Sequence, residues 1–178
     1  MPTQVELLKK YNLPIRGQMG QHLLIDPNIQ KKIVDLLQIT PGELVLEIGP
    51  GLGALTGEIL SRGASVYAVE KDERFLKILR DEWGADGRLE VHHQDVLEFD
   101  FSILKTKLKK QKTFQVVSNL PYYITAPILF KLIENHLLIK RAVLMMQKEV
   151  ADSILASPGG KDYGRLTLGV RYAAEVKH

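Results

Sequence analysis

The 178-residue chain contains no cysteine, so disulfide bonds and thiolate metal sites are excluded. No apolar run approaches the roughly 18 residues that a membrane-spanning helix needs. The first residues, MPTQVELLKKYNLPIRG, also lack the apolar stretch of a secretory signal peptide. From these absences we expect a cytoplasmic protein that is not bound to a membrane.

An excess of one charge is also missing, because 24 basic and 21 acidic residues leave a formal net charge of +3. So mild an excess argues neither for nor against nucleic acid as a partner. One stretch is nevertheless rich in lysine and free of acids: Lys105, Lys107, Lys109, Lys110 and Lys112. This basic window is either a solvated surface or a patch that contacts phosphates. Lys148 and Arg165 are further candidates for RNA contacts.

Apolar periodicity predicts helices at 3–11, from Pro27 to the break at 40–42, and at 53–63, 71–83, 126–138 and 148–156. Short apolar runs predict strands at 43–49, 65–70, 89–93, 114–119 and 141–147. Such alternation is typical of a parallel sheet covered by helices on both faces. We therefore predict a doubly wound, Rossmann-like α/β fold in one domain, 1–178, with a helical segment (1–40) before the core (41–178).

In such folds ligands bind beyond the carboxyl ends of the strands. This rule selects the predicted strand ends: 49–53, Glu70, 94–95, 119–122 and 147–148.

The first strand end combines Glu47 with Gly49, Gly51 and Gly53, ahead of a helix. Glycines allow a tight turn and a close approach of the backbone to a ligand. The spacing fits a dinucleotide fingerprint, and an acid ahead of the glycines resembles the S-adenosylmethionine loop of methyltransferases. A ligand-free structural turn is the third possibility. Pro50 lacks an N–H for a pyrophosphate, and Glu47 would repel one, so we favour S-adenosylmethionine.

Glu70 and Asp95 end the second and third predicted strands. The Glu70 carboxylate can accept hydrogen bonds from ribose hydroxyls. Asp95 either caps the following turn or accepts a bond from an adenine amino group, with Val96 against the ring. The consecutive residues His92 and His93 point to opposite faces of a strand, so they form a poor metal pair and we expect no metal.

The fourth strand ends in Asn119-Leu120-Pro121-Tyr122. Methylation of an exocyclic amine on a base requires acceptors for its two hydrogens, because the lone pair must point toward the methyl donor. The Asn119 side-chain amide and the Leu120 carbonyl provide these acceptors. The Tyr122 ring can stack on an extruded base.

These features occur within seven blocks in a fixed order: MGQHLLID (19–26), LEIGPGLGALT (46–56), Glu70, QDVLEFD (94–100), NLPYYIT (119–125), MQKEVADSI (146–154) and YGRLTL (163–168). With them the chain resembles the ribosomal RNA adenine N6,N6-dimethyltransferases of the small subunit. Related macrolide-resistance methyltransferases share the Asn-Leu-Pro-Tyr block, and the last two blocks favour the small-subunit branch.

The resemblance implies a class I S-adenosylmethionine-dependent methyltransferase that dimethylates adenine N6 in small-subunit ribosomal RNA during ribosome assembly. The expected partner is the immature small subunit, and we expect a monomer. Its implied cofactor contacts are His22, Leu24, Gly49, Glu70, Asp95 and Asn119, to which our reading of the strand ends adds Gly51 and Val96. Asn119, Leu120 and Tyr122 would position the target adenine.

The chain departs from the family at two places. Met19 stands where the family usually has phenylalanine, a substitution that should still pack. The sequence ends at AAEVKH, whereas family members continue with two strands, a proline-rich segment and a small helical domain. We therefore expect a catalytic domain alone, with an exposed sheet edge, that binds cofactor but methylates ribosomal substrate poorly.

Two alternatives stay open at this stage. One is methylation of another RNA or DNA adenine, or of a protein glutamine, although Leu120 and the later blocks argue against it. The other is a non-catalytic RNA-binding or ribosome assembly factor that has kept the cofactor fold.

Overall fold

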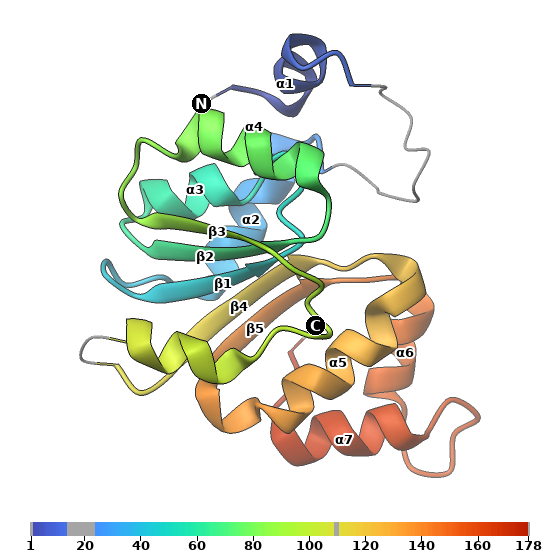
Figure 1. Cartoon of the computed structure of the whole chain (residues 1–178). Coiled ribbons are helices and arrows are strands. Elements are labelled where there is room, and N and C mark those ends of the chain that lie inside the picture. The colour runs from blue at the N-terminus through green and yellow to red at the C-terminus, as the bar shows by residue number, and fades with distance from the viewer. Residues whose placement is uncertain (1, 14–23, 109–110, 178) are drawn as a thin grey trace.

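Five short apolar runs form one parallel sheet in the order β3-β2-β1-β4-β5, with β1 at its centre (Figure 1). The computed structural model describes residues 2–13, 24–108 and 111–177. The strands are β1 (Leu44–Ile48), β2 (Ser65–Glu70), β3 (Leu89–His93), β4 (Phe114–Asn119) and β5 (Ile139–Met145). The predicted doubly wound parallel sheet is therefore confirmed.

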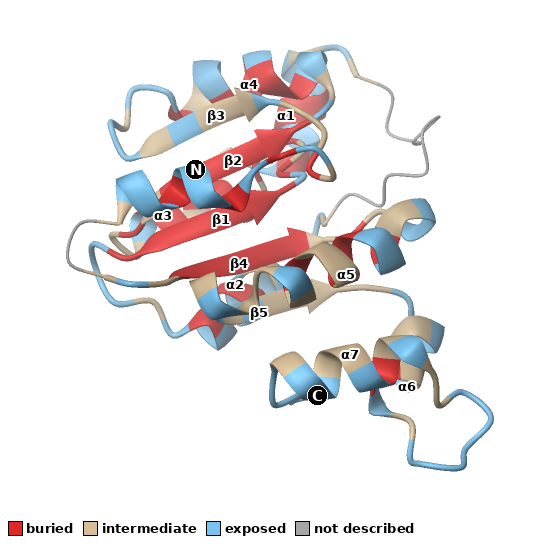
Figure 2. Cartoon of the chain, turned by 60° about the horizontal axis from the view of Figure 1, so that its bottom comes forward, coloured by how far each residue is buried: buried red, intermediate tan, exposed pale blue. Residues whose placement is uncertain are grey.

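The central strands are buried on both faces, which explains why they are apolar throughout (Figure 2). Successive side chains alternate between two cores, so that Val45 packs on one side of the sheet and Leu46 on the other. β3 and β5 lie at the two edges, where intermediate and exposed residues replace buried ones.

Helices cover both faces of the sheet (Figure 1). The α-helices are α1 (Gln4–Lys10), α2 (Pro27–Leu37), α3 (Thr56–Ser61), α4 (Glu73–Trp83), α5 (Thr125–Glu134), α6 (Lys148–Leu155) and α7 (Arg165–Ala173). Short 3₁₀ helices are η1 (Phe101–Lys107), η2 (Tyr122–Ile124) and η3 (His136–Leu138). Residues of α1 to α4 belong to one core, and those of η1 and α5 to the other. None of the helices in the described ranges is long and apolar enough to cross a membrane.

Two helices begin at an aspartate whose side chain caps the first turn. The Asp26 side chain accepts a hydrogen bond from the Asn28 N–H at 2.8 Å, and Pro27 is the first helical residue of α2. The Asp72 side chain caps α4 in the same way, accepting from the Arg74 N–H at 3.0 Å.

Several element boundaries differ from the prediction. The helix predicted from residue 53 begins only at Thr56, because Gly53 has a φ of +74°, which a right-handed helix cannot contain. β5 begins at Ile139 and ends at Met145, since it pairs with the whole of β4. The helix predicted to reach 138 ends at Glu134 and is followed by η3. Helix α7, which packs beside α5 and α6, was not predicted.

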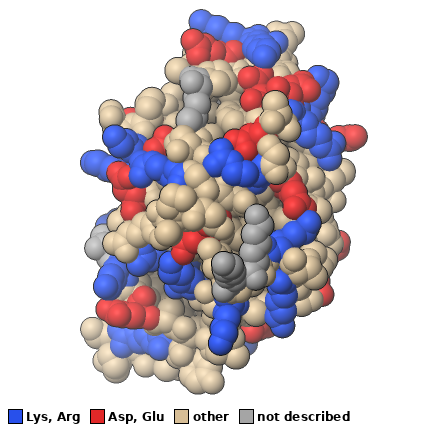
Figure 3. Space-filling model, turned by 90° about the vertical axis from the view of Figure 1, so that its left-hand side faces the viewer, with Lys and Arg blue, Asp and Glu red and all other residues tan. Residues whose placement is uncertain are grey.

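The chain order creates a switch point between β1 and β4. From β1 the chain builds β2 and β3 on one side, and it then crosses to β4 and β5 on the other. The crevice at the carboxyl ends of β1 and β4 is where such sheets bind ligands. The described lysines of the basic window, Lys105, Lys107 and Lys112, lie at the opposite end of the sheet, because η1 and the residues after it lead to the start of β4. Figure 3 shows that end, where basic and acidic side chains are interspersed.

Gly53 is held by both backbone and packing, so Gly53→Ala should destabilise the fold by about 2–4 kcal/mol. A Cβ there would lie 2.6 and 2.7 Å from two atoms of the Trp83 ring, at a φ of +74°. Gly87→Ala is the matched control, because its Cβ meets open space and its φ is not positive. Urea denaturation of both variants tests this, and equal midpoints would contradict it.

Candidate active site

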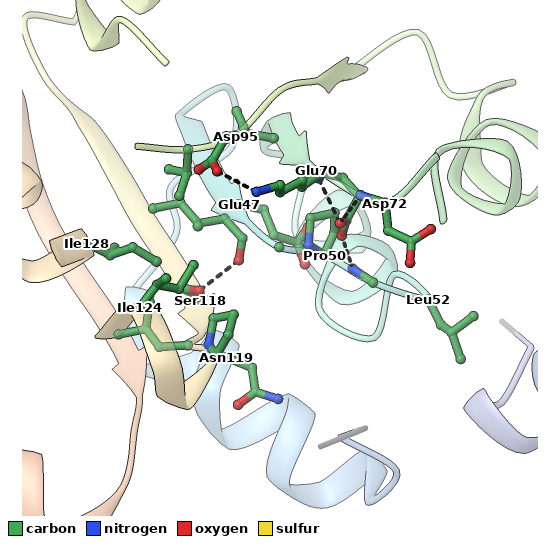
Figure 4. Close-up of a pocket in the computed structure, with 18 of the residues that line it drawn as sticks. Glu47, Pro50, Leu52, Glu70, Asp72, Asp95, Ser118, Asn119, Ile124 and Ile128 are labelled. Atoms are coloured by element: carbon green, nitrogen blue, oxygen red, sulfur yellow. Dashed lines mark hydrogen bonds and ion pairs between the residues drawn. The ribbon is translucent and has the colours of Figure 1, made fainter. Parts of the chain in front are cut away.

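A cavity of about 590 Å³ opens at the carboxyl ends of the strands. It is lined by nine residues selected from the sequence: Leu24, Gly49, Gly51, Glu70, Asp95, Val96, Asn119, Leu120 and Tyr122. His22, the remaining candidate, lies outside the described residues. Figure 4 shows Glu70, Asp95 and Asn119 arranged around this cavity. Glu70 and Asn119 are the last residues of β2 and β4, and Asp95 follows β3. The structure thus brings together residues that are up to 98 positions apart, from Leu24 to Tyr122.

The Glu70 carboxylate connects the ends of β1 and β2. Its Oε2 accepts a hydrogen bond from the Gly51 N–H at 3.0 Å, and its Oε1 accepts from the N–H groups of Lys71 and Asp72, both at 2.8 Å. Burial raises the pKa of Glu70, and these backbone hydrogen bonds oppose that rise. The glycine loop and the second strand end are therefore fixed relative to one another by one side chain.

Gly49 and Gly51 of the glycine loop line the cavity. Gly49 and Gly51 have φ values of +63° and +57°, which strongly favour glycine. A Cβ built on either residue would have no atom within 4 Å, so both border open space. The loop therefore presents bare backbone to whatever occupies the cavity.

Glu47 lies beneath this loop and is buried completely. Its Oε2 accepts a hydrogen bond of 2.6 Å from the hydroxyl of Thr56, at the start of α3. Burial raises the pKa of Glu47 to about 7, and the nearby charge of Glu70 adds to the rise. No salt bridge to Glu47 or Glu70 occurs among the residues that the structure describes. Two buried carboxylates thus face the cavity without a cationic partner in that part of the chain.

Asp95 and Val96, which follow β3, also line the cavity. Asp95 Oδ1 accepts from the Leu97 N–H at 2.9 Å, and Oδ2 accepts from the Lys71 ammonium at 2.8 Å. The hydrogen bond from Lys71 lowers the pKa of Asp95, and that from Leu97 lowers it further. The structure is compatible with both predicted roles of Asp95, capping the turn and binding an adenine amino group. Oδ1 caps the local turn, and Oδ2 contacts the Lys71 side chain at the cavity.

The fourth strand end is held by β1, β5 and its own turn. The Ser118 hydroxyl donates to the Ile48 carbonyl at 2.7 Å, and the Leu120 N–H donates to the Met145 carbonyl at 2.9 Å. The Thr125 hydroxyl donates to the Pro121 carbonyl at 2.9 Å. Leu120 is buried, whereas Tyr122 in η2 is 40% exposed at the cavity. The tip therefore has a fixed backbone and an accessible aromatic ring.

Gln4, Lys71 and Tyr123 are among the cavity residues that were not selected from the sequence. Gln4 reaches the loop from α1, and its side-chain amide donates to the Leu52 carbonyl at 3.4 Å. No sequence signal could reveal this contact, because it depends on how α1 packs. Lys71 and Tyr123 each directly follow a residue that had been selected, so the strand-end rule would have found them with a wider window.

The histidines at the third strand end do not form a metal site. His92 stacks on Tyr67 with ring centroids 4.0 Å apart, while His93 lines the cavity. In the described ranges no group of three or more His, Asp or Glu side chains could hold a metal ion.

The polar chemistry of the cavity suits a particular kind of ligand. Three carboxylates, Glu47, Glu70 and Asp95, offer acceptors to hydroxyl, amino and cationic groups. A pyrophosphate would be repelled by the same charges. The cavity therefore fits an adenosyl ligand with a cationic amino-acid portion better than a dinucleotide.

Comparison with known structures first identifies the class. The chain resembles a dimethyladenosine transferase from Plasmodium falciparum, with a TM-score of 0.72 and 37% identity over 84% of this chain and 52% of that one. It also resembles the 23S rRNA methyltransferase ErmE, with a TM-score of 0.62 and 29% identity over 81% and 53% of the two chains. The fold is that of the class I methyltransferases, a class that uses S-adenosylmethionine.

Sequence comparison then identifies the family. A family model described as ribosomal RNA adenine dimethylase matches residues 12–178. Proteins named ribosomal RNA small subunit methyltransferase A are 43% identical in Halothermothrix orenii and 44% identical in Geobacillus kaustophilus, over 97% of this chain. The chain belongs to the ribosomal RNA adenine dimethylase family. It spans 58% and 59% of the length of these two relatives.

The buried Glu47 predicts a pH-dependent stability that Glu47→Gln should remove. Its pKa of about 7 lies above the ordinary value of 4.5, so the folded state holds a proton that the unfolded state has lost between these pH values. The stability of the ligand-free protein should therefore fall as pH rises from 4.5 to 7. Glu47→Gln should be more stable than the wild type by about 3 kcal/mol at pH 8, and equally stable near pH 4.5.

Denaturant unfolding at both pH values measures this difference, with Glu98→Gln as a control that removes an exposed carboxylate. A Glu47→Gln variant that is no more stable than the wild type at pH 8 would show that Glu47 carries no penalty there.

Proposed function

We propose that this protein binds S-adenosylmethionine and dimethylates N6 of adenines in small-subunit ribosomal RNA, with the immature small subunit as its partner. The observation that carries the proposal is the shared cavity: the Asn119–Tyr122 tip opens onto the same space as Glu70 and Asp95. The relatives named above support the small-subunit substrate. With a ribosomal subunit as partner, the expected place of action is the cytoplasm.

The chain's own residues divide into two groups around the cavity. Glu70 would hold the ribose hydroxyls, and Asp95 with Val96 would hold the adenine of the cofactor. Gly49 and Gly51 would let the backbone approach its amino-acid portion, and Leu24 with His22 would complete the site. When bound, S-adenosylmethionine supplies a methyl group made electrophilic by its sulfonium sulfur.

The second group positions the target base. The Asn119 side-chain oxygen and the Leu120 carbonyl accept the two hydrogens of the exocyclic amine, which directs its lone pair into the cavity. Tyr122 stacks on the extruded base. Catalysis then rests on orientation and proximity, so no strong base is required. Support comes from the fixed Leu120 backbone, the exposed Tyr122 ring and the cavity that both adjoin.

Asn119→Ala should lower the rate of methyl transfer about 100-fold, because one of two acceptors for the amine is lost. The measurement is a single turnover on immature small subunits with protein in excess, so that weak substrate binding does not hide the chemical step. Gln111→Ala is the control, since it removes a side-chain amide near Gly42, at the other end of the sheet.

Calorimetry with S-adenosylmethionine and with NAD accompanies these rates. Asn119 is also an expected cofactor contact, so the assigned role is supported if Asn119→Ala lowers methylation far more than it weakens binding of S-adenosylmethionine. Unchanged methylation would mean that another residue accepts the amine hydrogens. Binding of NAD but not of S-adenosylmethionine by the wild type would overturn the proposed function, and binding of RNA without methylation would favour an assembly factor.

A further inference from the structure

An ion pair crosses the cavity between the second and third strand ends. Lys71 directly follows Glu70, which fixes its backbone by accepting its N–H at 2.8 Å. From there its side chain reaches Asp95, where the ammonium lies 2.8 Å from Oδ2, as the dashed line at Asp95 in Figure 4 shows. The Lys71 side chain is 73% exposed and that of Asp95 is 23% exposed.

This ion pair occupies the acceptor that the proposed function assigns to the cofactor. Asp95 Oδ1 is already held by the Leu97 N–H at 2.9 Å. An adenine amino group that binds Oδ2 would share this oxygen with the Lys71 ammonium. A second donor on that oxygen weakens the bond to Lys71, and exposed ion pairs of this kind contribute too little stability to resist.

Once displaced from Asp95, the Lys71 ammonium could pair with another anion at the cavity. Among the described residues that line the cavity, two carry a lysine or arginine side chain, Lys71 and Arg74. The Arg74 guanidinium is held by the Asp72 carboxylate through two hydrogen bonds of 3.0 and 2.7 Å. In the ion pair Asp95 raises the pKa of Lys71, with smaller contributions from Tyr123 and Glu98. A solvent-exposed lysine ammonium is charged at neutral pH in any case.

The surroundings of Lys71 are those of a nucleic-acid contact. Tyr122 and Tyr123 of η2 line the same cavity and are 40% and 74% exposed. Exposed aromatic rings beside a cation are the usual means of binding single-stranded nucleic acid, because bases stack on the rings and phosphates pair with the cation. Tyr123 has no other role in the proposed reaction.

We propose that Lys71 couples cofactor binding to RNA binding by changing its partner. Without cofactor it pairs with Asp95; when Asp95 takes the adenine amino group, the ammonium pairs with an RNA phosphate beside the target nucleotide. This inference rests on the proposed function and adds to it a positioning residue and a preferred order, with cofactor before RNA. Because linkage is reciprocal, bound RNA should equally strengthen cofactor binding.

The test compares RNA affinity with and without saturating S-adenosylhomocysteine, which carries the adenosyl group but no sulfonium charge. The probe is a short single-stranded RNA that contains adenines, and the proteins are the wild type, Lys71→Met and Lys71→Arg. Lys9→Met is the control, since Lys9 is an exposed lysine at the far end of α1.

For the wild type and Lys9→Met we expect about fivefold tighter RNA binding with S-adenosylhomocysteine. The slope of log affinity against log salt should also steepen by about 0.7, the value for one further phosphate contact on a single strand. Lys71→Met should show neither change, and Lys71→Arg should keep both, because its charge can still exchange partners.

Binding of S-adenosylhomocysteine, measured by calorimetry, separates the possible failures. Lys71→Met should bind it at least as tightly as the wild type, because no ammonium has to be displaced. Tenfold weaker binding would mean that Lys71 only holds Asp95 in place, and it would overturn the inference. Equal coupling in Lys71→Met and the wild type, or none in the wild type, would also overturn it. A wild type that fails to bind S-adenosylhomocysteine would overturn both this inference and the proposed function.

Discussion

The carboxylate of Glu70 is the contact on which the geometry of the cavity depends. It is buried, and it receives three backbone N–H groups from two strand ends, those of Gly51, Lys71 and Asp72. Through Gly51 it sets the glycine loop, and through Asp72 it sets the residue that caps α4. Through Lys71 it directs a side chain that reaches Asp95 at the third strand end. One buried carboxylate thereby fixes the glycine loop, the end of β2 and the side chain that contacts Asp95, in the ligand-free protein.

Such a site is built at the expense of stability, which is characteristic of binding sites. Glu47 is fully buried with one hydroxyl as its side-chain hydrogen-bond donor, and its pKa of about 7 reflects the unfavourable burial of its charge. The fold tolerates the unfavourable burial of Glu47 because the apolar cores on both faces of the sheet fix the surrounding backbone. A cationic ligand would offset the cost of burying the Glu47 charge. The free energy that this burial costs the ligand-free protein would then contribute to the affinity for the ligand.

The two ends of the sheet have different characters. At the carboxyl ends, acidic side chains and backbone glycines gather around a cavity. At the opposite end lies the basic window, where Lys107 already pairs with Glu90 at 2.7 Å, while Lys109 and Lys110 fall outside the described residues. RNA contact by this window stays a prediction, and a contact by its described lysines would lie at the opposite end of the sheet from the target base. The exposed Tyr122 and Tyr123 mark the side from which a base would enter.

The sequence by itself determined the fold class and the chemistry of the strand ends. Apolar runs separated by glycines leave little choice but a buried parallel sheet, and in such a sheet the residues after each strand must meet at one edge. For this reason Glu70, Asp95 and Asn119 could be selected without a structure. Only the tertiary structure decided which side chains hold one another there. The partnership of Lys71 with Asp95 and the approach of Gln4 to the glycine loop depend on packing between distant segments, to which local periodicity is blind.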